Sequence, residues 1–152
     1  MILDERTEFC DATSAVLAFG ATGAIIGDVI DLKSATTSPN TTIDLEGSDV
    51  YLVIQVDTTF VGATSTTKFQ LASDSTADLA TSRTNHIATG DIPVATLVAG
   101  YVVFAGKLPS GSYERYLGIW ETVGTANVTA GKINAFLTSD PALYRAYADN
   151  VA

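Results

Sequence analysis

Short runs of apolar and β-branched residues with the spacing of β-strands recur along the chain. The clearest run, Val50–Asp57, is almost continuously apolar, which is typical of a strand covered on both faces. In Thr67–Ala72, Phe69 and Leu71 alternate with polar residues, which indicates one buried face and one face in water. Together the two patterns predict an antiparallel sheet.

A pair of strands around a turn is predicted over Tyr101–Glu121, because two apolar runs flank Pro109 and Gly111. In the returning strand, Tyr116 and Trp120 would share one face, while the aliphatic residues between them take the other. Further strands are expected at Lys132–Thr138, Asp28–Leu32, His86–Thr89 and Ile92–Ala95.

Helix signals are scarce. The best one is Asp140–Asp149, where Asp140 would cap the helix and Pro141 suits its first turn; a frayed tail is the alternative. About eight short strands without alternating helices predict an all-β fold, an antiparallel sandwich of the jelly-roll kind. We expect a single sandwich domain over residues 1–140, followed by a C-terminal tail over residues 141–152 that holds the possible short helix.

The composition agrees with a folded domain that carries little charge. The chain has 152 residues, of which 47% are hydrophobic and 16% charged, against roughly 25% charged in an average soluble protein. A chain of this length can hold a core of its own, and this mixture argues against intrinsic disorder. The scarcity of charge also suggests that a partner covers part of the surface.

The net charge of −9 disfavours nucleic acid and anionic membranes as partners. Affinity for phosphate depends on Lys and Arg, and the eight such residues are scattered. The apolar stretch Ala15–Ile26 follows acidic residues, is interrupted by Gly20 and Gly23, and is too short to span a bilayer. Cys10 is the only cysteine, so no intramolecular disulfide forms. We therefore expect synthesis and folding in a cytoplasm.

Several segments resemble those of a known family. The opening MILDERTEFCDATSA resembles the start of the capsid cement, or decoration, proteins of tailed bacteriophages. The resemblance continues, in the expected order, at Asp28–Leu32, Val50–Phe60, Leu97–Phe104, Leu108–Ile119 and Val128–Asp140. The chain departs from the family in the loop Ser34–Leu45 and in the aromatic tail after Asp140.

What this resemblance implies is a structural protein. It implies a jelly-roll sandwich that forms a homodimer or a higher oligomer and is assembled in the bacterial host cytoplasm. In the virion it would sit on the outer surface of an icosahedral capsid and bridge subunits of the major capsid protein. Such a protein would need no cofactor, and we expect no enzymatic site.

No catalytic or metal-binding motif stands against that expectation. His86 is the only histidine; Asp91 is its nearest candidate partner, but an ordinary structural histidine is the more common case. No serine has the G-x-S-x-G context, and the glycines at 20, 23 and 27 lack the lysine of a phosphate-binding loop. Carboxylates gather at residues 28–31 and 44–49 without EF-hand spacing, so a solvated loop explains them better than calcium. We predict neither an enzyme nor a metal site.

Aromatic residues are the remaining candidates for function, since interfaces are enriched in Tyr and Trp. We expect partner contacts near the chain ends, at Ile2, Leu3, Phe9, Tyr144 and Tyr147. The alternative is a carbohydrate-binding module that exposes Tyr116 and Trp120 as a flat platform. A hydrolase on a β scaffold is the least favoured reading.

Overall fold

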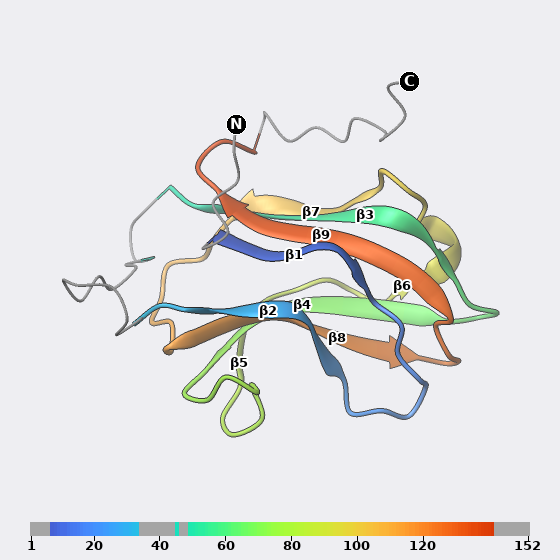
Figure 1. Cartoon of the computed structure of the whole chain (residues 1–152), viewed down its shortest axis with the longest axis horizontal. Coiled ribbons are helices and arrows are strands. Elements are labelled where there is room, and N and C mark those ends of the chain that lie inside the picture. Colours follow the sequence, from blue (N-terminus) through green and yellow to red (C-terminus); the bar gives the residue numbers. More distant parts are fainter. Residues whose placement is uncertain (1–6, 34–44, 46–48, 142–152) are drawn as a thin grey trace.

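Two antiparallel sheets lie face to face and form a β-sandwich (Figure 1). The computed structural model describes residues 7–33, 45 and 49–141. The all-β prediction is therefore confirmed. The elements are β1 Glu8–Ser14, β2 Ala24–Asp31, β3 Tyr51–Val61, β4 Thr66–Asp74, β5 Thr84–Ala88, β6 Ile92–Pro93, the 3-10 turn η2 Val94–Thr96, β7 Val102–Lys107, β8 Tyr116–Gly124 and β9 Ala130–Thr138.

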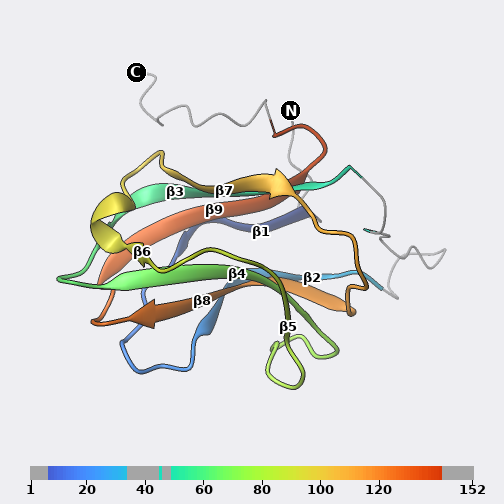
Figure 2. The same cartoon turned by 180° about the vertical axis from the view of Figure 1, so that it is seen from behind.

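The strand order is that of a jelly roll. One sheet has the order β1-β9-β3-β7, and the other has the order β2-β8-β4-β5, with β6 also paired to β4. The chain passes from one sheet to the other after β1, β2, β3, β6, β7 and β8, so each sheet combines early and late strands (Figure 2). Apart from the short β6, this order gives two interleaved sheets of four strands each, which is the arrangement of the double-sheet jelly roll.

Most predicted strands are present, but their pairing differs in one place. The segments that lead into and out of the turn at Pro109 are strands β7 and β8, as expected. They are not paired with each other: β7 pairs with β3 in one sheet, while β8 pairs with β2 and β4 in the other. The two strands predicted around this turn are therefore present, but they do not form a hairpin. Turn residues indicate that the chain reverses its direction, but they do not indicate which strands pair. Here the reversal leads from one sheet to the other, and Leu108 at its start is buried.

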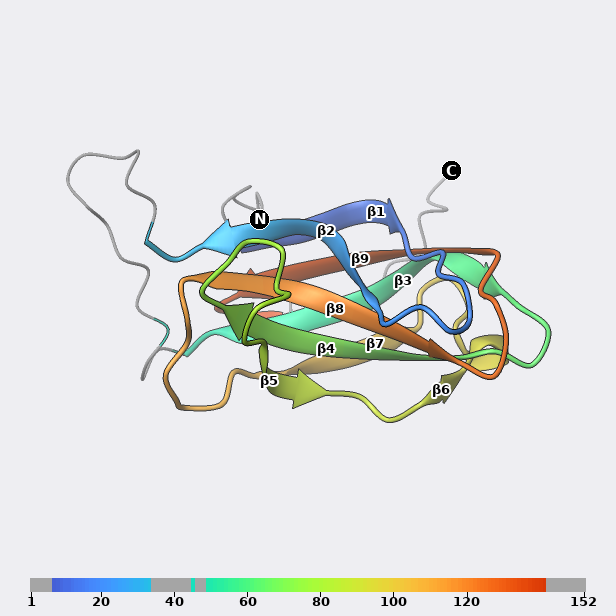
Figure 3. The same ribbon diagram turned by 90° about the horizontal axis from the view of Figure 1, so that it is seen from below.

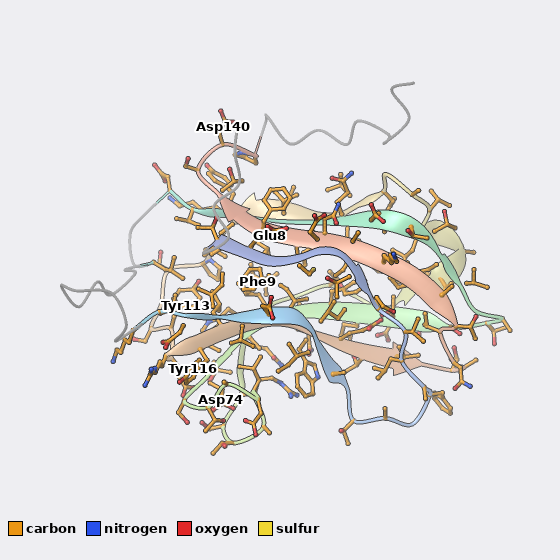
Figure 4. The ribbon with its side chains drawn as sticks, viewed as in Figure 1. Glu8, Phe9, Asp74, Tyr113, Tyr116 and Asp140 are labelled. Carbon is orange, nitrogen blue, oxygen red and sulfur yellow. The ribbon has the colours of Figure 1, made fainter. Side chains whose placement is uncertain are left out.

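The N-terminal strand β1 was not predicted. Its sequence EFCDATS has only Phe9 and Cys10 as apolar anchors, so no alternation is visible. It pairs with β9 through two register shifts, and Ala12 has a φ of 44°, which bends the strand. The aromatic ring of Phe9 points between the sheets and is 1% exposed (Figure 4).

The core lies between the two sheets and follows the alternation read from the sequence. Leu52 and Ile54 of β3 face Leu117 and Ile119 of β8 across it, and all four side chains are at most 1% exposed. The expectation that β3 is covered on both faces also holds at Val53, which points outward and is 2% exposed. The side chains of the two sheets therefore form one continuous core between them.

A second, smaller apolar cluster lies on the outer face of the sheet β2-β8-β4-β5. The connection of residues 75–83 between β4 and β5 folds back across this face (Figure 3). It inserts Leu79, which is fully buried at a φ of 50°, against Ala72 and Trp120. Gly118 leaves room for Leu79, because a Cβ at that glycine would lie 2.9 Å from a Leu79 methyl carbon. The loop of residues 75–83 therefore covers part of this sheet face, which would otherwise be exposed to solvent.

Asp74 at the end of β4 holds this loop in place (Figure 4). Its carboxylate accepts hydrogen bonds from the backbone N–H groups of Thr76, Thr81 and Ser82 at 3.3, 3.0 and 2.9 Å. Burial would raise the pKa of Asp74, but these donors favour the charged form and lower the pKa to about 2. The loop therefore keeps its anchor at any physiological pH.

Candidate docking surface

None of the five residues predicted from the sequence as partner contacts lies on the surface that the structure describes. Ile2, Leu3, Tyr144 and Tyr147 lie outside the described residues. Phe9 lies in the core, where its side chain is 1% exposed, so we no longer count it among the contacts. The sequence alone does not distinguish an apolar residue near a chain end that belongs to the core from one that lies on the surface.

Exposed apolar side chains are instead concentrated at one end of the sandwich. This end, here called the apolar end, consists of the connections 15–23, 62–65, 94–101 and 125–129 with the adjoining strand termini (right in Figure 1). Within the described part of the chain, every large hydrophobic side chain that is exposed, from 37% to 57%, lies here: Val16, Phe19, Val61, Val98, Tyr101 and Val102. Patches of this kind mark interaction sites.

The apolar end also carries no charge. None of its four connections contains Asp, Glu, Lys or Arg. Beside it, Lys68 and Asp91 pair with each other at 3.4 Å. Depletion of charge together with exposed aromatic and aliphatic side chains is the composition of the centre of a protein interface. The end therefore has the chemistry of a protein-binding surface.

Hydrogen bonds between the connections make this surface a preformed one. Asn127 joins two of them, because its Oδ1 accepts the Phe19 N–H at 2.8 Å and its carbonyl accepts the Ser65 hydroxyl at 2.6 Å. The Val128 N–H donates to the Leu17 carbonyl at 3.1 Å. The connection 94–101 is tied to β3 through the bond from the Phe60 N–H to the Leu97 carbonyl, at 2.9 Å. Little ordering is therefore needed on binding.

The opposite end of the sandwich is charged. Arg115 donates two hydrogen bonds to Asp31, at 2.9 and 2.8 Å, and these lower the pKa of Asp31. Lys107 pairs with Asp49 at 2.5 Å, and this hydrogen bond lowers the pKa of Asp49. The molecule is therefore polarised along its strands, with a neutral apolar end and a charged end.

The histidine lies in a structural contact. His86 Nε2 lies 2.7 Å from Ser73 Oγ, and its ring stacks on Tyr113 with centroids 4.2 Å apart. Burial lowers the pKa of His86, which favours the neutral ring as the acceptor of the Ser73 hydroxyl. A histidine can activate a neighbouring serine as a nucleophile. Ser73, however, is fully buried in the sheet, and its hydroxyl oxygen also accepts a hydrogen bond from the Glu114 N–H at 3.1 Å. A substrate has no access to it.

The surface of Trp120 is covered. The indole is 8% exposed: the Arg83 guanidinium lies 3.9 Å from its ring centroid, and Leu79 packs in the same cluster. Gly23 closes its edge, since a Cβ there would lie 2.2 Å from Nε1. Tyr116 and Trp120 therefore form no flat platform for a sugar ring, as the carbohydrate-binding alternative requires.

One acidic groove runs along the edge formed by β1 and β2. It measures about 290 Å³ and is lined by Glu8, Phe9, Cys10, Asp11, Thr13 and Asp28. Burial raises the pKa of the Cys10 thiol to about 12, so the thiol is unreactive.

Within the described ranges, no three side chains of His, Cys, Asp or Glu are grouped as metal ligands, and no helix is long and apolar enough to cross a membrane.

Fold and surface together define a small jelly-roll protein with one uncharged end that exposes apolar side chains. The chain belongs to the Bbp16 family, whose model matches residues 13–137. The match runs from the last two residues of β1 to the penultimate residue of β9, and so includes the whole apolar end. A comparison with curated proteins gave no match.

Proposed function

We propose that this chain is a capsid cement protein that binds the outside of an icosahedral phage head and bridges subunits of the major capsid protein. The observation that carries the proposal is the gathering of exposed apolar side chains at one uncharged end of a rigid jelly roll. The name of the Bbp16 family suggests a phage-related protein and supports the phage setting. The protein would be assembled in the host cytoplasm and remain on the virion surface.

A cement protein would stabilise the shell by adding contacts across the boundaries between capsid subunits. A shell under the pressure of packed DNA separates at its subunit contacts, and a protein that spans a contact adds bonds that must break at the same time. Each patch needs only modest affinity, because once one patch is bound the next engages at high effective concentration. The hydrogen bonds that tie the apolar end together reduce the entropy lost on binding.

The charge distribution supports the same orientation. An uncharged end meets the shell without the cost of burying unpaired charges. The charged end faces solvent, where the net charge of −9 keeps decorated particles apart. Because the net charge is −9 and the eight Lys and Arg residues are scattered along the sequence, the chain would act on the protein shell and not on the DNA inside it.

Phe19→Ser should weaken binding to phage heads about tenfold or more while leaving the fold intact. Phe19 is 57% exposed in the free protein, so the substitution removes buried apolar area only from the complex. We expect the free energy of unfolding to change by less than about 1 kcal/mol. Binding isotherms from co-sedimentation and urea unfolding of the free protein measure the two quantities separately.

A matched pair of charge substitutions locates the surface. Thr64→Asp adds one negative charge at the apolar end, and Ser112→Asp adds the same charge at the opposite end; both side chains are exposed. Only Thr64→Asp should weaken head binding, because only that charge would be buried at the contact. Equal binding of both variants, or loss with Ser112→Asp alone, would show that the apolar end is not the docking surface.

A further inference from the structure

A polar pair is buried in the core beneath the apolar end. Glu121 of β8 and Thr67 of β4 point between the sheets, and each is 1% exposed. The Thr67 hydroxyl donates to Glu121 Oε1 at 2.7 Å, and the Thr122 carbonyl lies 3.4 Å from the same hydroxyl. A hydroxyl carries a single proton, so these two acceptors share one donor. Within the described residues, this shared hydroxyl is the group that favours an ionised Glu121.

Two connections of the apolar end adjoin Thr67. The connection 62–65 ends two residues before it. Its partner in the neighbouring strand is Ile92 of β6, and the connection 94–101 starts two residues after Ile92. A change in the packing around Thr67 therefore reaches both connections within two residues.

The other two connections adjoin Glu121. The connection 125–129 starts four residues after it, and its partner in β2 is Ala24, which directly follows the connection 15–23 (Figure 3). A Cβ at Gly23, the last residue of that connection, would lie 2.7 Å from the Glu121 carbonyl oxygen. Glu121 is therefore placed where the connections of the apolar end meet the core.

No charge in the core compensates an ionised Glu121. Burial raises the pKa of Glu121 from 4.5 to about 7, the bond from Thr67 lowers it, and no charged group contributes. Two other residues of the surrounding core can titrate, Cys10 and Tyr113, and the pKa of neither is shifted by Glu121. The charged side chains of β2, β3, β4 and β9 do not contribute to the pKa of Glu121 either: Asp28, Asp31, Asp57, Lys68, Asp74 and Lys132. Water is therefore the remaining source of solvation for this carboxylate.

Water has its most direct route to Glu121 through the apolar end. The connections there are joined by individual hydrogen bonds, such as those from the Phe19 N–H to Asn127 and from the Val128 N–H to the Leu17 carbonyl. Opening such connections costs less free energy than unfolding the whole domain. Because an ionised carboxylate in an apolar core is costly until it is hydrated, ionisation favours the opened form.

We propose that proton release from the Glu121 carboxyl to water opens the apolar end, which is closed at mildly acidic pH and loosened at mildly alkaline pH. The proton returns to the carboxyl when the pH falls, and the connections close again. Docking requires the closed form, so binding to phage heads should be weaker at pH 8 than at pH 5.5. This last consequence rests on the proposed function; the opening itself does not.

Amide hydrogen exchange of the free full-length chain tests the opening. The pKa of Glu121 is about 7 in the closed form and returns to about 4.5 once the carboxyl is hydrated, so opening should increase about 30-fold from pH 5.5 to pH 8. We expect the protection factors of the Phe19 and Val128 amides, which correct for the intrinsic effect of pH on exchange, to fall by that amount. The amides of Leu32 and Leu108 are bonded to the Arg115 and Val50 carbonyls at the charged end, and their protection should stay constant.

Two carboxyl-to-amide substitutions separate Glu121 from other acidic groups. Glu121→Gln cannot ionise, so its Phe19 and Val128 amides should be equally protected at both pH values. Asp91→Asn makes the same exchange beside the apolar end, at a side chain that is 68% exposed, and should keep the pH dependence of the wild type.

Constant protection of Phe19 and Val128 in the wild type would overturn the proposal. An equal loss at Leu32 and Leu108 would also overturn it, because the whole domain would then be opening. Both outcomes are read from the wild-type chain and do not depend on how well a variant folds. Neither involves phage heads: an end that opens with pH but binds no capsid would refute the proposed function alone, and head binding by an end with constant protection would refute the opening alone.

Discussion

Trp120→Ala should lower the free energy of unfolding by about 3–5 kcal/mol, the usual cost of truncating a buried aromatic residue. The indole is 8% exposed, under the Arg83 guanidinium and beside Leu79. Its removal would leave a cavity beneath the loop 75–83, which packs on the outer face of the sheet through that cluster. Urea unfolding at neutral pH measures the change.

Phe19→Ala is the matched control, since it truncates an aromatic ring that is 57% exposed. We expect it to change stability by less than about 1 kcal/mol. If Trp120→Ala is equally mild, the indole is not part of a core. The covered face would then be open, and a sugar platform at Tyr116 and Trp120 would again be possible.

Glu121→Gln should stabilise the protein by up to about 3 kcal/mol at pH 8 and have little effect at pH 4.5. Glu121 lies on the inner face of β8, is 1% exposed, and accepts a hydrogen bond from the Thr67 hydroxyl at 2.7 Å. Burial raises its pKa from 4.5 to about 7, while the bond from Thr67 lowers it. A carboxyl so placed prefers to be neutral.

The sign of the pH dependence follows from that raised pKa. At and below pH 4.5 the carboxyl can be protonated in both the folded and the unfolded chain, so folding carries no penalty. As the pH rises toward 7, the unfolded chain releases the proton first, and stability falls until the folded state also ionises. Glutamine does not titrate, so the variant lacks this loss.

Thr67→Val is the opposing control for Glu121. It removes the hydroxyl that favours the charged carboxylate, so it should enlarge the loss of stability between pH 4.5 and pH 8. Urea unfolding of both variants at the two pH values gives the comparison. A Glu121→Gln effect that is the same at pH 4.5 and pH 8 would show that Glu121 is already ionised or solvated in the folded protein.

The sequence contained the local information needed for the strands and their faces. The apolar run at Val50 and the alternation at Phe69 correspond to β3 and β4, and the faces assigned around Trp120 are those observed. The same alternation puts Glu121 on the face of Leu117 and Ile119, so its burial could have been predicted. Periodicity works here because the period of a strand is a local property.

Contacts between segments far apart in the sequence could not be predicted from the periodicity of apolar residues. The turn at Pro109 does not reveal that β7 and β8 belong to different sheets, and Leu79 is a single leucine in a polar loop. The apolar end is formed by four connections that are far apart along the chain, so no single segment of the sequence indicates it. Only the jelly-roll topology brings Phe19 and Val98 to the same end.

The most direct test of the cement role is co-sedimentation of the purified protein with phage heads that lack it, followed by heating of the decorated particles. We predict saturable binding and a higher temperature of head rupture for decorated heads than for bare ones. Absence of binding, or binding that leaves the rupture temperature unchanged, would contradict the proposal that this chain stabilises a capsid.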